Sequence, residues 1–177
     1  MFSEKHGAFV FFVCFVGANQ FRKSHWVHTM TSGTTINKAE IRTLIPHSGM
    51  MCLLDEVTQW DDRSITCVTN THRDPANPLR RDGRLSAVHA FEYGAQAAAV
   101  HGGLRARSAG AIAPPGYLAA LRDARLHVAS LDDIQSALQL HALRLFGDGV
   151  NCVYECRVSA ADTLLAKGRV TIVQRGA

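Results

Sequence analysis

The sequence lacks the short motifs that mark many well-known catalytic and metal sites. It contains no GxSxG elbow, no P-loop, no HExxH pair and no GxGxxG ahead of a predicted helix. Its five cysteines include no CxxC pair, which argues against a zinc ribbon or a dithiol redox site. We therefore expect no metal and no redox cofactor, and we interpret the cysteines as reduced thiols of a cytoplasmic protein.

Charge is also scarce in this chain. Of the 177 residues, 19% are charged and 47% are hydrophobic, and the formal net charge is +4. This balance fits one globular domain with a substantial core. It falls short of the positive charge typical of nucleic-acid binders, so we expect no nucleic-acid partner. Most basic residues are arginines, which favour acidic or phosphate-bearing partners.

The first 29 residues differ in composition from the rest. Gly7–Ala18 reads GAFVFFVCFVGA, an apolar run that is too short to span a bilayer. Met30 is followed by a polar stretch typical of the start of a soluble protein. We interpret residues 1–29 as an extension outside the domain that results from a misassigned start codon, with a signal segment or membrane-surface anchor as the alternative. Residues 30–177 are then expected to form a single domain, without a stable membrane span.

Along that domain the pattern predicts a short helix, two strands, one long helix and four further strands. Asn37 can cap the first helix, Lys38–Leu44, which Pro46 ends. The first two strands are predicted at Met51–Trp60 and Ser64–Thr71, and a loop rich in turn residues covers Arg73–Arg84. The last four strands are predicted at Gly116–Val128, Ala137–Phe146, Val150–Ala160 and Leu164–Gln174. Because Arg122 and Arg125 are an odd number of positions apart on a strand, we expect them on opposite faces.

The long helix, Ala87–Gly103, is the most informative stretch. It reads AVHAFEYGAQAAAVHGG, with Gly102 and Gly103 as the predicted terminator. A helix that is apolar on nearly all sides must be wrapped by a curved antiparallel sheet, with a second subunit as a further means of cover. Glu92 lies in its middle, and Gln96 follows one turn later on the same face. A carboxylate among alanines is costly to keep ionised, which makes Glu92 a functional candidate.

Three blocks of the chain resemble the β-hydroxyacyl-acyl-carrier-protein dehydratases. They are Leu44–Val57 (LIPHSGMMCLLDEV), Phe91–Ala97 (FEYGAQA) and Gly116–Leu126 (GYLAALRDARL), in the family's order. The similarity covers roughly residues 37–175 and is closest to the divergent branch associated with aryl-polyene-type pathways. The resemblance implies an α+β hot-dog fold, in which a curved antiparallel sheet wraps one long central helix.

The resemblance also implies an activity, the dehydration of a 3-hydroxyacyl thioester in fatty-acid or polyene-type biosynthesis. Glu92 would be the acid that protonates the leaving hydroxyl, supported by Gln96. In that family a loop histidine, reached across the dimer interface, completes the site, but Pro78 occupies its usual position here. We take His72 as the candidate base, with His89 as the alternative. His47, in the IPHSG stretch, matches a family position that we interpret as structural.

Dehydration also requires donors for the thioester oxygen, and the start of the helix can supply them. Backbone amides around Ser86–Val88, in particular those of Ala87 and Val88, are the candidates. The run Arg80, Arg81 and Arg84 forms either a solvated loop or a binding surface for the phosphopantetheine phosphate or an acidic carrier-protein helix.

The expected partners are an acyl carrier protein, which supplies its own phosphopantetheine arm, and a second hot-dog subunit in a homodimer or heterodimer. Two other functions remain open from the sequence. One is a hot-dog acyl thioesterase, in which the helix carboxylate activates water. The other is a catalytically silent acyl-binding subunit of a heterodimeric dehydratase, which the missing loop histidine favours.

Overall fold

The computed structural model describes residues 35–174, so the expectations for residues 1–29 lie outside it. The strands are β1 (Ile36–Asn37), β2 (Glu56–Trp60), β3 (Ser64–Thr69), β4 (Gly116–Leu126), β5 (Leu138–Gly147), β6 (Asn151–Ala160) and β7 (Thr163–Gln174). The α-helices are α1 (Lys38–Leu44) and α2 (Ala90–Ser108), and short 3-10 helices are η1 (Gly49–Met51), η2 (Thr71–Arg73) and η3 (Ala87–His89). No helix among the described residues is both long and apolar enough to cross a membrane.

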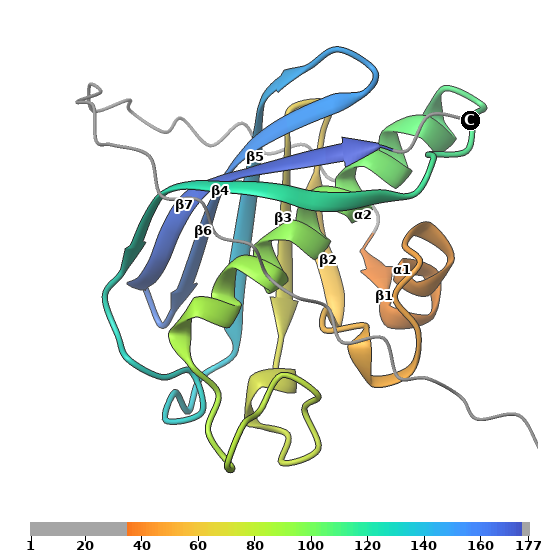
Figure 1. Cartoon of the computed structure of the whole chain (residues 1–177). Coiled ribbons are helices and arrows are strands. Elements are labelled where there is room, and N and C mark those ends of the chain that lie inside the picture. Colours follow the sequence, from red (N-terminus) through yellow and green to blue (C-terminus); the bar gives the residue numbers. More distant parts are fainter. Residues whose placement is uncertain (1–34, 175–177) are drawn as a thin grey trace, which may run out of the picture.

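The strands form one antiparallel sheet of seven strands in the order β1-β2-β3-β5-β6-β7-β4. The sheet bends around α2, which runs through its concave side (Figure 1). The connection from β3 to β5 contains α2 and β4, so the strand that follows the helix pairs at the far edge, against β7. This arrangement confirms the predicted hot-dog fold.

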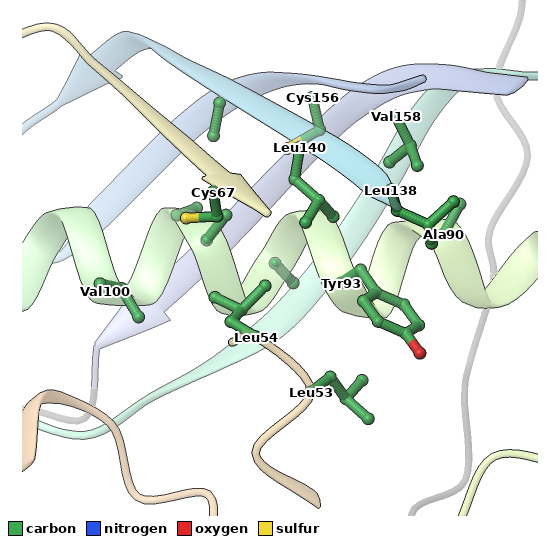
Figure 2. Packing of buried hydrophobic residues seen from close by; sticks show 14 of the residues in the cluster. Leu53, Leu54, Cys67, Ala90, Tyr93, Val100, Leu138, Leu140, Cys156 and Val158 are labelled. Atoms are coloured by element: carbon green, nitrogen blue, oxygen red, sulfur yellow. The ribbon is translucent and has the colours of Figure 1, made fainter. Parts of the chain in front are cut away.

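Side chains from the strands and from the segment before β2 pack on opposite sides of α2. Figure 2 shows Cys67, Leu140 and Cys156 pointing from the sheet towards the helix, while Leu53 and Leu54 approach from the other side. All five side chains are at most 1% exposed. The long helix thus lies inside the core, as its alanine-rich composition predicts.

Small residues allow α2 to lie this close to its neighbours. A Cβ on Gly94 would lie 2.9 Å from Cys156 Cβ, and one on Gly103 would lie 3.0 Å from the Leu44 carbonyl oxygen. The expectation that Gly102 and Gly103 end the helix is wrong, because α2 continues to Ser108. Gly103 is instead the point of close approach between α1 and α2.

Two other predictions also need correction. The strand predicted at Met51–Trp60 begins only at Glu56, since the chain first forms η1 and a buried loop. Arg122 and Arg125 share one face of the sheet, opposite Arg169 and Lys167 respectively. A bulge between them, with Asp123 at a φ of 51°, changes the alternation that their spacing implied.

Two glycines of α2 test this packing in opposite directions. Gly94→Ala should destabilise the protein by about 1–3 kcal/mol, because its methyl group overlaps Cys156. Gly102→Ala should stabilise it by up to ~1 kcal/mol, because no atom lies within 4 Å of the new Cβ and alanine favours the helix. Urea unfolding measures both changes. A shift of the same sign and size in both variants would contradict the packing described here.

Candidate active site

The sheet leaves one stripe of α2 uncovered. Between Ala90 and Leu104 every residue is buried except Glu92, Ala99 and Gly102, which recur at helical spacing on one side. Val88, one turn before Glu92, is 43% exposed. The single carboxylate of this part of α2 therefore lies on the only face of the helix segment that solvent or a partner can reach, which makes this stripe the candidate site.

His47 faces Glu92 across this opening. Its Nε2 lies 3.5 Å from Glu92 Oε1, and the two side chains are 28% and 13% exposed. His47 Nδ1 is buried and has no hydrogen-bond partner within residues 35–174. The histidine reaches the helix because α1 ends at Leu44, ahead of Pro46, and the following loop returns across α2. The residue that we interpreted as structural is thus the histidine that the fold brings to the carboxylate.

Gln96 fixes this loop to the helix. Its Oε1 accepts a hydrogen bond from the Leu53 amide at 3.0 Å, and its Nε2 donates to the Met51 carbonyl at 2.9 Å. The same Nε2 donates to Glu92 Oε1 at 3.2 Å. The backbone partners determine the amide orientation, because an N–H can only donate and a carbonyl can only accept. Both His47 and Gln96 contact Oε1, so within residues 35–174 Glu92 Oε2 has no hydrogen-bond partner.

These contacts set the charge of Glu92. Burial raises its pKa, but the hydrogen bonds from His47 and Gln96, with the nearby charges of His47 and His89, outweigh burial and hold the pKa below its ordinary value. Glu92 is therefore a carboxylate at neutral pH. His89 is half-buried, and burial together with the charge of Arg81 lowers its pKa, while Glu92 acts in the opposite direction.

The structure does not bring His72 to this site. The ring is fully buried, and its Nε2 lies 3.0 Å from the Ile134 carbonyl oxygen, so Nε2 carries the proton. Burial lowers the His72 pKa, as do the charges of Arg73 and Arg80, although the bond to Ile134 opposes them. His72 is a neutral side chain that ties η2 to the loop before β5.

The backbone amides at the start of the helix differ in their availability. The Ala87 amide donates to the Ala129 carbonyl at 3.0 Å, and the His89 amide donates to the Ser86 carbonyl at 3.1 Å. In the part of the chain that the structure describes, the Val88 amide has no acceptor. Of the two predicted donors, Ala87 is therefore occupied and Val88 is free.

The three predicted binding arginines hold the loop before the helix. Arg80 donates to the carbonyls of Asp74, Gly83 and His72 at 2.6–2.9 Å. Arg81 donates to the Pro78 and Arg80 carbonyls, and Arg84 pairs with Asp132 at 3.4 Å and Asp133 at 3.2 Å. Arg81 and Arg84 remain exposed, whereas Arg80 is partly buried and its guanidinium group is occupied by backbone carbonyls of the loop.

A cavity of about 270 Å³ lies between α1 and the loop after β3. Its lining residues are Lys38, Arg42, Gly49, Met50, Thr71, Asp74 and Asn77. Gly49 and Met50 belong to η1, the turn that follows His47, so the cavity adjoins the loop that carries the histidine. Within residues 35–174 no three His, Cys, Asp or Glu side chains gather in a way that could hold a metal ion.

Comparison with known proteins connects this geometry to one family. Residues 39–176 match the model of the ApeP-like family, described as ApeP dehydratase. The dehydratase heterocomplex ApeI:P from Xenorhabdus doucetiae contains a chain that is 27% identical, with a TM-score of 0.70; the match covers 77% of this chain and 91% of that chain. No curated protein matches significantly.

Two more distant structures share the fold alone. AziG from S. sahachiroi is 14% identical with a TM-score of 0.53, and the match covers 76% of this chain and 99% of that chain. A putative thioesterase from Shewanella oneidensis is also 14% identical, with a TM-score of 0.52 and coverage of 76% and 91%. The fold alone therefore does not distinguish dehydration from thioester hydrolysis.

The role of Gln96 can be tested by its removal. Gln96→Ala leaves the Leu53 amide and the Met51 carbonyl unpaired, so we expect a loss of about 1–3 kcal/mol in the free energy of unfolding. Gln139→Ala, at an exposed position of β5, is the control and should change it by less than about 0.5 kcal/mol. Equal effects of the two substitutions would show that Gln96 does not fix the loop.

Proposed function

Since the chain belongs to the ApeP-like dehydratase family, we propose that it removes water from a 3-hydroxyacyl thioester carried on an acyl carrier protein. The observation that carries this proposal is the approach of His47 Nε2 to Glu92 Oε1 at 3.5 Å on the open stripe of α2. Dehydration needs one group that takes the proton from the α-carbon and another that protonates the departing hydroxyl. Glu92 and His47 form such a pair.

The charge of Glu92 supports a division of the two roles. Because its pKa is held below the ordinary value, Glu92 is ionised at neutral pH and is suited to act as the base. Glu92 then takes the α-proton through its free Oε2, and His47 gives a proton to the hydroxyl as the carbon–oxygen bond breaks. The products are the 2-enoyl thioester and water. This order is the reverse of the roles that the family resemblance implies for the glutamate.

The thioester oxygen gains negative charge as the α-proton leaves, and a hydrogen-bond donor must stabilise it. The free amide of Val88 lies one turn before Glu92 on the same side of the helix. It also lies at the amino end of a helix, where the dipole favours negative charge. We assign this role to the Val88 amide alone, since the Ala87 amide is already bonded to Ala129.

A second hot-dog subunit is the proposed cover for the open stripe of α2. The matched relative belongs to a complex of two different dehydratase chains. Here the exposed Val88 and the partly exposed Glu92, Ala99 and Gly102 leave the reacting pair open on one side. A partner placed over them would exclude water and strengthen the electrostatic interactions of the pair.

The exposed Arg81 and Arg84 lie on the loop just before the helix and are the proposed contacts for the acidic carrier protein.

Turnover of a 3-hydroxyacyl carrier-protein substrate, with the hot-dog partner present, tests this function. Glu92→Gln and His47→Asn should each reduce kcat for water loss by about 10²–10⁴-fold, because each removes one of the two proton-transfer groups. His127→Gln changes an exposed histidine that follows β4 and does not belong to the proposed pair, so it should retain the activity of the unchanged protein. Full dehydratase activity of Glu92→Gln would contradict the assignment.

The division of roles has its own test with a saturated acyl thioester, which has an α-proton but no hydroxyl. In D₂O the unchanged protein should exchange the α-proton for deuterium. His47→Asn should retain this exchange and Glu92→Gln should lose it, because only the base is needed. The opposite pattern would show that His47 is the base.

The turnover assay with the 3-hydroxyacyl substrate also distinguishes the two alternative functions. Release of free thiol instead of water would identify a thioesterase, and acyl binding without turnover would identify a silent subunit.

A further inference from the structure

Leu53 connects the proposed base to a second group of polar side chains. Its amide donates to Gln96 Oε1 at 3.0 Å, and Gln96 Nε2 donates to Glu92 Oε1 at 3.2 Å. Both bonds involve the same side-chain amide, so the position of Leu53 helps to orient the N–H group that Gln96 presents to Glu92. Leu53 is fully buried, and its carbonyl oxygen is held from another direction.

Two threonines at the end of β3 hold this carbonyl. Thr69 Oγ1 donates to the Leu53 carbonyl oxygen at 2.6 Å, and Thr71 Oγ1 donates to it at 2.7 Å. A carbonyl oxygen can accept both bonds because it has two lone pairs. Leu53 is thus fixed through its carbonyl to the end of β3 and through its amide to α2.

The direction of each hydrogen bond behind Thr71 is determined by backbone partners. Asn77 Nδ2 donates to the Thr71 carbonyl at 2.8 Å, and Asn77 Oδ1 accepts from the Leu79 amide at 3.0 Å. Asn77 Nδ2 therefore also donates to the Tyr93 hydroxyl oxygen, at 2.9 Å. The Tyr93 proton is then available for Thr71 Oγ1 at 3.0 Å, and the Thr71 proton for Leu53. We term Asn77, Tyr93 and Thr71 the polar triplet.

The polar triplet lies mostly inside the protein. Tyr93 is 0% exposed and Asn77 is 4% exposed, and Figure 2 shows the Tyr93 hydroxyl on the side of α2 where Leu53 lies. Burial and the charge of Asp55 raise the pKa of Tyr93, although the bonds with Thr71 and Asn77 oppose them. The hydroxyl is therefore protonated at neutral pH and can donate. A buried network in which each member has its partners favours one geometry.

We propose that the polar triplet positions the proposed base, Glu92. The triplet holds Leu53, and Leu53 in turn orients the Gln96 amide that donates to the carboxylate. Within residues 35–174 no member of the triplet bonds to Glu92 itself, so its role is positional and not chemical. The inference rests on the proposed function in taking Glu92 as the base, while the hydrogen-bond path ends at this carboxylate whatever the reaction.

A ¹³C NMR titration of the Glu92 carboxyl carbon tests this path without substrate or partner. Thr71→Val keeps the shape of the side chain but removes the hydroxyl that holds Leu53. The Glu92 pKa should then rise, because the bond from Gln96 weakens while burial still acts. Tyr93→Phe should also raise it, and this variant serves if Thr71→Val does not fold. Thr71→Ser keeps a hydroxyl and should leave the pKa unchanged.

Two matched controls remove hydroxyl groups outside the path. Thr66→Val changes a threonine of β3 whose hydroxyl has no hydrogen-bond partner in the described part of the chain. Tyr117→Phe changes a tyrosine that is 47% exposed. Both should retain the Glu92 pKa of the unchanged protein. His47 and His89, the titratable groups whose charges act on Glu92, are the same in all these variants.

A double-mutant cycle tests whether the triplet acts through the glutamine. In a Gln96→Ala background, Thr71→Val should change the Glu92 pKa no further, because the path is already interrupted. An additional rise as large as that in the unchanged protein would show that Thr71 acts by another route. A rise in Thr71→Ser equal to that in Thr71→Val would show that the hydroxyl is not the cause. Either result would overturn the proposal.

Kinetics with the 3-hydroxyacyl carrier-protein substrate separate this inference from the proposed function. Thr71→Val should lower kcat by up to about 10²-fold with little change in KM, and the acid limb of its pH profile should move to higher pH. Full activity of Glu92→Gln would contradict the function, yet the NMR titration would still report on the path. If Thr71→Val and Tyr93→Phe lower stability but leave both the Glu92 pKa and the pH profile unchanged, the triplet only stabilises the fold and the inference is wrong.

Discussion

An ionised carboxylate inside an apolar helix is the constraint on which this structure depends. Glu92 is 13% exposed on a helix whose other positions up to Leu104 are almost all buried. The cost of removing such a charge from water is several kcal/mol, and the protein offsets it with two side chains, His47 and Gln96. Each of them requires the loop after α1 to lie across α2. The carboxylate, the loop and the helix therefore form one unit.

The remaining architecture follows from the need to enclose this helix. The sheet curves around α2, and glycines at positions 94 and 103 allow the close contacts with β6 and α1. Arg107 near the end of α2 pairs with Glu40 in the first turn of α1 at 2.8 Å. Together with the close contact of Leu44 and Gly103, this ion pair fixes both ends of α1 against α2. Because the sheet leaves only the Glu92 stripe of the segment Ala90–Leu104 open, the proposed base lies on the one side of this segment that a substrate or partner can reach.

The sequence predicted the elements better than the site. The strand and helix pattern identified α1 to the residue and the last four strands to within two residues, because periodicity and turn residues are local signals. The end of α2 was missed, because the glycines that usually stop a helix serve a tertiary contact with Leu44. The bulge at Asp123, which places Arg122 and Arg125 on one face, also has no clear local signal.

The sequence also did not show which histidine faces Glu92, for a related reason. The choice of His72 rested on its position before the helix, but the pairing of Glu92 depends on a contact between residues far apart in the chain. His47 could have been favoured by its place in the IPHSG block, which precedes the Leu53 segment that Gln96 binds. Only the three-dimensional path of that loop shows that Nε2 faces the carboxylate.

The central claim is that His47 keeps Glu92 ionised. The most direct test is a ¹³C NMR titration of the Glu92 carboxyl carbon in the unchanged protein and in His47→Ala. We predict a Glu92 pKa below the ordinary glutamate value of 4.5 in the unchanged protein, and a higher pKa in the variant, where burial acts without the histidine. A Glu92 pKa that lies above 4.5, or that does not respond to the loss of His47, would contradict this account.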